Sequence, residues 1–260
     1  MPSYPIDFSE CLQKGAVGAV GAIPGTIAAH PFDLIKMRQQ VSGNSIGQIV
    51  GSLGVNGPTA FWRGAGAGIA QKVVTRGPMF LASEASTQGV QRATGLSREY
   101  ALFAGSALSG YVVGLCAAPA EWAKVQRGVT NANFRAILGA SGGIRRLHGA
   151  GLRNAVFDST FFGTEHATRR AGAPASLSYG CAAALAVVLD FPLDVAVKRS
   201  MAAPPSSPVQ PPLAATWSLL CKHRAGVFVG LAAKAVEFSI SYAVTGHCST
   251  YVVGWLSPAL

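Results

Sequence analysis

Charged and hydrogen-bonding side chains recur inside segments that otherwise consist of apolar and small residues. The candidates for a functional role lie midway along three of these segments: Lys72, Thr75, Arg76, Arg153, Asn154, Asp158, Lys234 and Glu237. A charge at the depth of a bilayer core is costly, so it usually faces a polar interior and serves a function. A site with both signs favours a zwitterion or a small carboxylate. The alternative is that these charges only solvate one another in a water-filled interior.

The spacing of these residues predicts local relationships on two helices. Lys72 and Arg76 are four residues apart, so they are expected to share one helix face. Lys234 and Glu237 are three residues apart, so they are expected to pair with each other.

A second set of charges belongs to three proline-centred motifs, each of which closes an apolar segment. The motifs are Pro31-Phe32-Asp33-Leu34-Ile35-Lys36, Pro119-Ala120-Glu121-Trp122-Ala123-Lys124 and Pro192-Leu193-Asp194-Val195-Ala196-Val197-Lys198. Proline kinks a helix, which predicts that the acid and the base sit near the axis of a helix bundle. Isolated charges there are expensive, so we expect acids and bases to pair. In the third motif the base has moved one place, from Val197 to Lys198.

The composition favours a membrane protein. The chain has 260 residues, of which 50% are hydrophobic and 12% charged, and its mean hydropathy is +0.34. A bilayer crossing needs about 20 residues. Six segments are long enough: 11–38, 66–92, 98–126, 151–170, 175–200 and 228–255. The net charge is +10, and the basic residues that lie between the segments suit anionic headgroups or anionic solutes.

Several classes of function lack their sequence signals. The chain has no basic-aromatic motif, nucleophile elbow, phosphate loop or metal-like spacing of histidine and cysteine. We therefore expect no nucleic acid partner, no enzyme activity, no cofactor and no metal.

The chain also contains a threefold repeat. Gly68-Ile-Ala-Gln-Lys-Val-Val-Thr75, Gly151-Leu-Arg-Asn-Ala-Val-Phe-Asp158 and Gly230-Leu-Ala-Ala-Lys-Ala-Val-Glu237 align without gaps, independently of the proline motifs. The repeats are predicted over residues 8–95, 96–172 and 173–260, within a single domain 1–260. Short surface helices are predicted over 44–53, 133–138 and 213–222, the last with Trp217 and Leu220 facing inward.

This repeat of Pro-x-acid-x-x-base resembles the mitochondrial carrier family. The resemblance implies an all-α membrane protein with six transmembrane helices in three pseudo-threefold repeats and short matrix-side surface helices. It also implies a multi-pass protein of the mitochondrial inner membrane, with both termini in the intermembrane space. Such carriers move solutes by alternating between two gated states.

The resemblance assigns roles to the motif residues. It implies a matrix gate in which Asp33 pairs with Lys124 and Asp194 with Lys36, while Glu121 either reaches Lys198 or has no bond. Gln40 matches the family position that braces one pair. Trp62-Arg63-Gly64 matches an element associated with cardiolipin. Solute contacts are implied either at Thr75, Asp158 and Glu237 or at the arginine-led pair Arg153-Asn154.

The gate on the opposite side is predicted to be degenerate. Only Glu84 and Glu165 mark it, and Arg169 is placed to pair locally with Glu165 on one helix face. Two hypotheses therefore stay open. The chain is a carrier of a small carboxylate, amino acid or related metabolite, or it is a carrier-derived structural subunit of a large inner-membrane complex.

Overall fold

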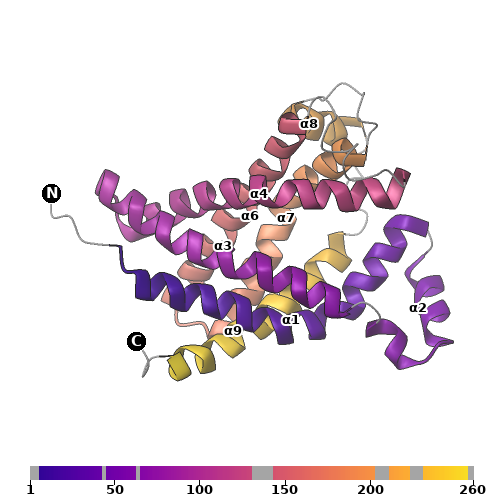
Figure 1. Cartoon of the computed structure of the whole chain (residues 1–260), viewed down its shortest axis with the longest axis horizontal. Coiled ribbons are helices and arrows are strands. Elements are labelled where there is room, and N and C mark those ends of the chain that lie inside the picture. The colour runs from indigo at the N-terminus through magenta and orange to yellow at the C-terminus, as the bar shows by residue number, and fades with distance from the viewer. Residues whose placement is uncertain are drawn as a thin grey trace.

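The structure is a computed structural model that describes residues 6–42, 45–62, 65–130, 143–202, 211–222 and 231–256. This part of the chain is helical and contains no strand, in agreement with the predicted all-α class. Six long helices dominate Figure 1: α1 (Phe8–Ser42), α3 (Ala65–Thr94), α4 (Arg98–Thr130), α6 (Gly143–Arg170), α7 (Ala175–Ala202) and α9 (Leu231–Leu256). Three short elements accompany them: α2 (Ile46–Gly54), the 3₁₀ helix η1 (Pro58–Trp62) and α8 (Pro212–Lys222).

α1, α3, α4, α6 and α7 each contain one predicted membrane segment, and α9 covers residues 231–255 of the sixth, whose first three residues lie outside the described part of the chain. α6 begins at Gly143 rather than at 151, because its first turns are basic and were invisible to a hydropathy pattern. α1, α4 and α7 run through Pro31, Pro119 and Pro192 without a break in the helix. In the described part of the chain, the helices that pass a length and hydropathy criterion for membrane spans are those over Arg98–Pro119 and Ala175–Met201.

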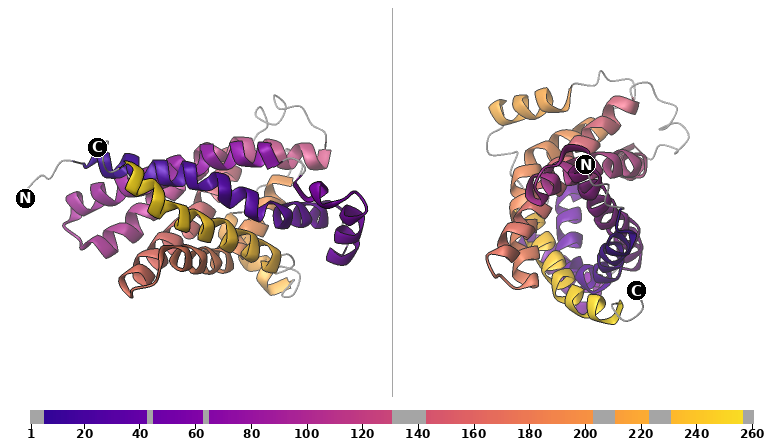
Figure 2. Two further views of the ribbon diagram at one scale, coloured as in Figure 1. Left: turned by 90° about the horizontal axis from the view of Figure 1, so that it is seen from below. Right: turned by 90° about the vertical axis from the view of Figure 1, so that its left-hand side faces the viewer.

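The long helices form a closed ring. Each contacts the next along the chain, and α9 returns to α1, as the end-on view in Figure 2 shows. Glycines permit the close contacts: a Cβ at Gly25 of α1 would lie 2.4 Å from the carbonyl oxygen of Ser241 on α9. A Cβ at Gly110 of α4 would lie 2.6 Å from the carbonyl oxygen of Asn154 on α6. Glycines at these contacts therefore let the backbones of neighbouring helices approach closely.

The predicted connector helices are present where the structure describes them. α2 begins at a capping box, in which Ser45 and Gln48 each accept a hydrogen bond from the other's backbone, and it buries Ile49 and Leu53 against Leu34 and Ala60. The connector helix predicted over 133–138 lies outside the described residues.

The side chain of Trp217 on α8 is oriented differently from the prediction. Trp217 was predicted to face inward, yet its side chain is 71% exposed, while Leu220 is half-buried. An apolar stripe shows only that a helix faces an apolar medium, and beside a membrane that medium need not be protein.

The interior of the ring is filled at one level by an aromatic cluster. Its members are Phe80, Phe157, Phe161, Phe162, Tyr179, Phe238 and Tyr242. Phe161 of α6 lies 4.6 Å from Tyr242 of α9, and Phe80 of α3 lies 5.1 Å from Phe162, between ring centroids. Because α3 and α6 are not neighbours in the ring, the second contact crosses the interior.

Candidate functional site

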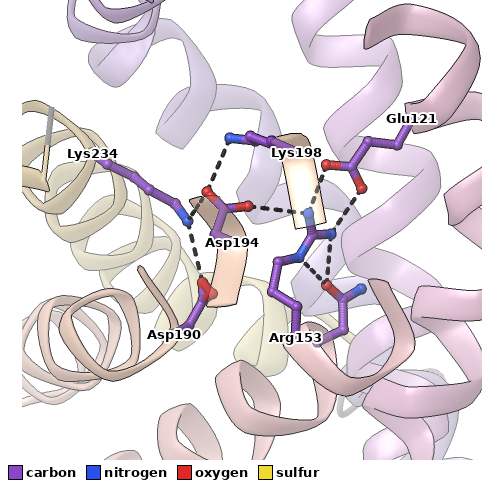
Figure 3. Close-up of polar contacts among 7 residues, drawn as sticks. Glu121, Arg153, Asp190, Asp194, Lys198 and Lys234 are labelled. Carbon is purple, nitrogen blue, oxygen red and sulfur yellow. Dashed lines mark hydrogen bonds and ion pairs between the residues drawn. The ribbon is translucent and has the colours of Figure 1, made fainter. Parts of the chain in front are cut away.

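Arg153 of α6 links acids from two other helices. Its guanidinium donates to Glu121 of α4 through two nearly parallel bonds, of 2.7 and 2.8 Å, and to Asp194 of α7 at 3.2 Å. Asn154 holds the guanidinium from behind, because its side-chain oxygen accepts from Nε at 3.1 Å and from Nη2 at 2.9 Å. The two-bond arrangement is the strongest geometry that an arginine and a carboxylate form. Figure 3 shows this arrangement.

Lys234 of α9 extends the same network. Its ammonium lies 2.8 Å from Asp194 and 3.2 Å from Asp190, and Lys198 approaches Asp194 at 3.0 Å from the next turn of α7 (Figure 3). Asp194 therefore faces three cations. We call Glu121, Arg153, Asp190, Asp194, Lys198 and Lys234 the Arg153 cluster. It joins α4, α6, α7 and α9, and the side chains of Lys234, Asp190 and Asp194 are almost fully buried.

The pairing predicted for the third motif is different in the structure. Glu121 pairs with Arg153 of α6, and Lys198 pairs with Asp194 on its own helix. The reason is geometric: an arginine on the facing helix presents two donors, whereas Lys198 is one helical step away from the family position. Val197, at that position, is buried against Trp122 and Met201 in an apolar contact between α4 and α7. The side chains of Lys36, Gln40 and Lys124 lie outside the described residues; Asp33 is half-buried.

The predicted pair of Lys234 with Glu237 is wrong. Lys234 turns to α7, and Glu237 lies 3.6 Å from Lys72 of α3. Inside a ring of helices, two interior residues on one helix can each meet a different neighbour. Lys72 also lies 4.8 Å above the ring of Phe238.

Arg76 has a different environment from the other interior cations. It is buried, donates to the hydroxyls of Thr245 at 3.0 Å and Ser241 at 2.7 Å, and stacks 4.0 Å from the ring centroid of Tyr242. No carboxylate of the described residues lies within ion-pair distance of it. Lys72 and Arg76 thus both face α9, as their spacing predicted. Thr75, between them, is half-buried and donates to the carbonyl of Lys72 at 3.3 Å.

Asp158 is the counterpart of Arg76 with the opposite sign. The residue is 3% exposed, and in the described part of the chain no hydrogen bond or ion pair reaches its carboxyl group. Its neighbour Phe157 packs against Tyr242 at 6.1 Å between ring centroids. Arg76 and Asp158 therefore flank the same aromatic cluster from α3 and α6.

A second polar cluster closes the opposite end of the ring, where the sequence marked Glu84 but predicted no bond from it to another helix. Glu84 of α3 is buried and lies 3.2 Å from Lys14 of α1 and 3.0 Å from Arg98 of α4. Arg98 also contacts Glu10 at 3.0 Å, and Gln88 donates to both acids. We call Glu10, Lys14, Glu84, Gln88 and Arg98 the Glu84 cluster. The sequence signal for this cluster was the pair Glu84 and Gln88, one helical turn apart, together with Arg98 just after the loop between α3 and α4.

Two other expectations concern single elements. Glu165 and Arg169 pair at 3.5 Å on one face of α6, which confirms the local pair predicted there. In the predicted lipid element, Trp62 is 44% exposed and its indole nitrogen donates to the carbonyl of Ile27 at 2.9 Å. Arg63 and Gly64 lie outside the described residues.

Comparison with known proteins agrees with this architecture. Residues 8–93 match the family model for mitochondrial carrier proteins, a span close to the first predicted repeat. A search of curated proteins found no match.

Proposed function

Because the chain belongs to the mitochondrial carrier family, we propose that it moves a small carboxylate, amino acid or related metabolite across the mitochondrial inner membrane by alternating access. The family supports a carrier-type solute transporter in general. The choice of solute class and the assignment of residues are our inference from the interior charges.

The observation that carries the proposal is the double position of Arg153. It belongs to the arginine-led pair Arg153-Asn154, and it also holds the acids Glu121 and Asp194 of two proline motifs. A solute carboxylate that binds Arg153 would compete with both acids for the same guanidinium donors. Removing the cation from a buried acid is strongly unfavourable. Binding would therefore weaken the helix contacts that close this end of the ring, which couples the solute to the gate.

Arg76 and Asp158 support the chemical class of the solute. The guanidinium of Arg76 is bound only by hydroxyls among the described residues, and the carboxyl of Asp158 has no described partner. A buried charge without an opposite charge is costly, so each can be compensated by a ligand. The carboxylate of an amino acid would suit Arg76, and its ammonium group would suit Asp158.

In this proposal the two clusters act as the two gates. By family orientation, the Arg153 cluster closes the matrix side and the Glu84 cluster closes the side of the intermembrane space. Each cluster must be weak enough to open while the other stays closed. The relative stability of the two closed clusters then decides which side of the ring is open. We further propose that cardiolipin binds at Trp62-Arg63-Gly64, where the exposed indole is held by α1.

A second candidate function has its own support. The Arg153 cluster and the Glu84 cluster are formed at the same time, and the aromatic cluster fills the interior between them. A bundle that is closed at both ends suits a carrier-derived structural subunit of a larger inner-membrane complex. Such a subunit needs a stable bundle but no alternation.

Thermal unfolding of the purified protein tests the solute site. We expect at least one of pyruvate, malate, alanine and glutamate to raise the unfolding temperature of the native chain but not of Arg153→Gln. Arg199→Gln, which changes an exposed arginine of α7, is the matched control and should respond like the native chain. Failure of every solute to stabilise the native chain would argue against the carrier proposal. Native electrophoresis from mild detergent then tests the alternative, because migration as a lone small species would contradict a subunit.

A further inference from the structure

Asp190 is a buried acid that none of the proline motifs or solute contacts includes. It lies in the apolar run before Pro192, one helical turn ahead of Asp194, and it is 3% exposed. Its Oδ2 atom accepts from Lys234 at 3.2 Å, whereas its Oδ1 atom is buried with no hydrogen-bond partner. A buried, ionised carboxylate normally accepts hydrogen bonds on both oxygens, so a carboxylate oxygen without any donor is unusual.

The two neighbouring acids are compensated unequally. Asp194 contacts Arg153, Lys198 and Lys234, with Lys234 at 2.8 Å. Asp190 has only a longer contact with that same Lys234. One lysine is therefore shared between two carboxylates, and Asp190 holds the smaller share. A buried carboxylate that shares its one cation with a neighbouring carboxylate is in an arrangement that favours binding of a proton.

The groups that face Asp190 from each neighbouring helix leave the imbalance in place. α9 contributes Lys234, which also lies 5.5 Å from the ring centroid of Phe191. α6 contributes Arg153, which is already occupied by Glu121 of α4 and by Asp194. Asp158 of α6 is a further buried acid and brings no cation. Among the described residues, no cation is left over for Oδ1 of Asp190.

We propose that Asp190 is a proton-binding site and that the carrier moves a proton together with its solute anion. The proton comes from the aqueous phase on the open side and converts the Asp190 carboxylate to a carboxylic acid. After the ring reopens on the other side, the proton leaves to water and the carboxylate returns. With a monocarboxylate as solute, one positive and one negative charge move together, so the transfer is electrically neutral. The coupling rests on the proposed transport function, but the proton site does not.

Infrared spectroscopy of the purified protein tests the site without any solute. The comparison is made in an Asp158→Asn background, which removes the other poorly compensated buried acid. In this background we expect the carbonyl band of a protonated carboxyl to appear as the pH is lowered through the neutral and mildly acidic range. Adding Asp190→Asn should remove that band, and adding Asp190→Glu should shift it. Absence of the band from the Asp158→Asn variant, or its survival after Asp190→Asn is added, would overturn the proposal. A shifted band in Asp190→Glu also shows that the site still forms when the side chain is changed.

Uptake into proteoliposomes tests the coupling. With labelled pyruvate, a monocarboxylate anion, as probe, an inward proton gradient should accelerate uptake by the native chain. Asp190→Asn should remove this acceleration, whereas Arg199→Gln, at an exposed arginine of α7, should retain it. Gradient-driven uptake that persists in Asp190→Asn would contradict the coupling. If no probe enters at all, the infrared result still decides the proton site, so the two failures are distinguishable.

Discussion

Arg153 of α6 and Glu121 of α4 form a two-bond ion pair, with donor–acceptor distances of 2.7 and 2.8 Å, inside a ring of six long helices. The pair joins the acid of the second proline motif, on α4, to a candidate for solute contact on α6. A ligand that binds Arg153 would therefore weaken the ion pair between α4 and α6 directly. The first prediction follows from this relationship.

Arg153→Gln should lower the free energy of unfolding by about 3 kcal/mol, because it leaves Glu121 and Asp194 with fewer opposite charges in a largely buried place. Adding Glu121→Gln should restore part of the loss, since the stranded charge disappears. Denaturant or thermal unfolding of the two single variants and the double variant measures the coupling energy. Strictly additive effects of the two substitutions would show that the pair does not act as a unit.

Gly25→Ala should destabilise the bundle by about 1–3 kcal/mol, because the added Cβ would lie 2.4 Å from the carbonyl oxygen of Ser241 and would push α1 from α9. The matched control is Gly89→Ala, on α3, where nothing lies within 4 Å of the new Cβ. That variant should gain about 0.5–1 kcal/mol, the usual preference of a helix for alanine. Equal unfolding temperatures for the two variants would contradict the close contact of α1 with α9.

Val197→Lys places a base at the spacing that the family motif has, yet it should impair folding. Val197 is buried with Trp122 and Met201, so an ammonium group there would lose its hydration without gaining a partner, at a cost on the order of 3 kcal/mol. Val197→Met adds length without charge and should cost less. Unfolding temperatures in detergent compare them. A more stable Val197→Lys would mean that Glu121 accepts the new base and that the apolar contact is dispensable.

Glu84→Gln should loosen the Glu84 cluster, because the buried carboxylate that binds both Lys14 and Arg98 becomes neutral. Cys11, which is buried in the same part of α1, reports on this. In a background with Cys116, Cys181, Cys221 and Cys248 changed to serine, we expect faster labelling of Cys11 by a polar maleimide. Glu165→Gln, which breaks only a local pair with Arg169, should leave the labelling rate nearly unchanged. If Glu84→Gln does not raise the labelling rate of Cys11, the Glu84 cluster does not act as a gate.

The helices were predictable because their signals are local. Apolar segments, glycine spacing and the capping residues near Ser45 act over one or a few turns, so they specify where α1 to α9 lie. The ion pairs between different helices were not predictable, because a partner depends on which interior side chains of other helices are in reach. Glu237 met Lys72 rather than Lys234, and Glu121 met Arg153 rather than Lys198. Asp190 was overlooked because it interrupts an apolar run without belonging to any motif.

The contacts within the aromatic cluster were also not predictable from the sequence. Phe157 and Phe161 recur at helical spacing, which predicts only an apolar face of α6. Only the closed ring shows that these rings meet Phe80 and Tyr242 across the interior. Whether the bundle moves therefore depends on packing that no single segment reveals.

Solute exchange in proteoliposomes tests the central claim most directly. Vesicles that contain the purified native chain and are preloaded with one of pyruvate, malate, alanine and glutamate are offered the labelled solute outside. We predict exchange of at least one solute by the native chain and by Arg199→Gln, and its loss in Arg153→Gln. No exchange of any of these solutes by a folded native chain, or undiminished exchange by Arg153→Gln, would contradict the role given to Arg153.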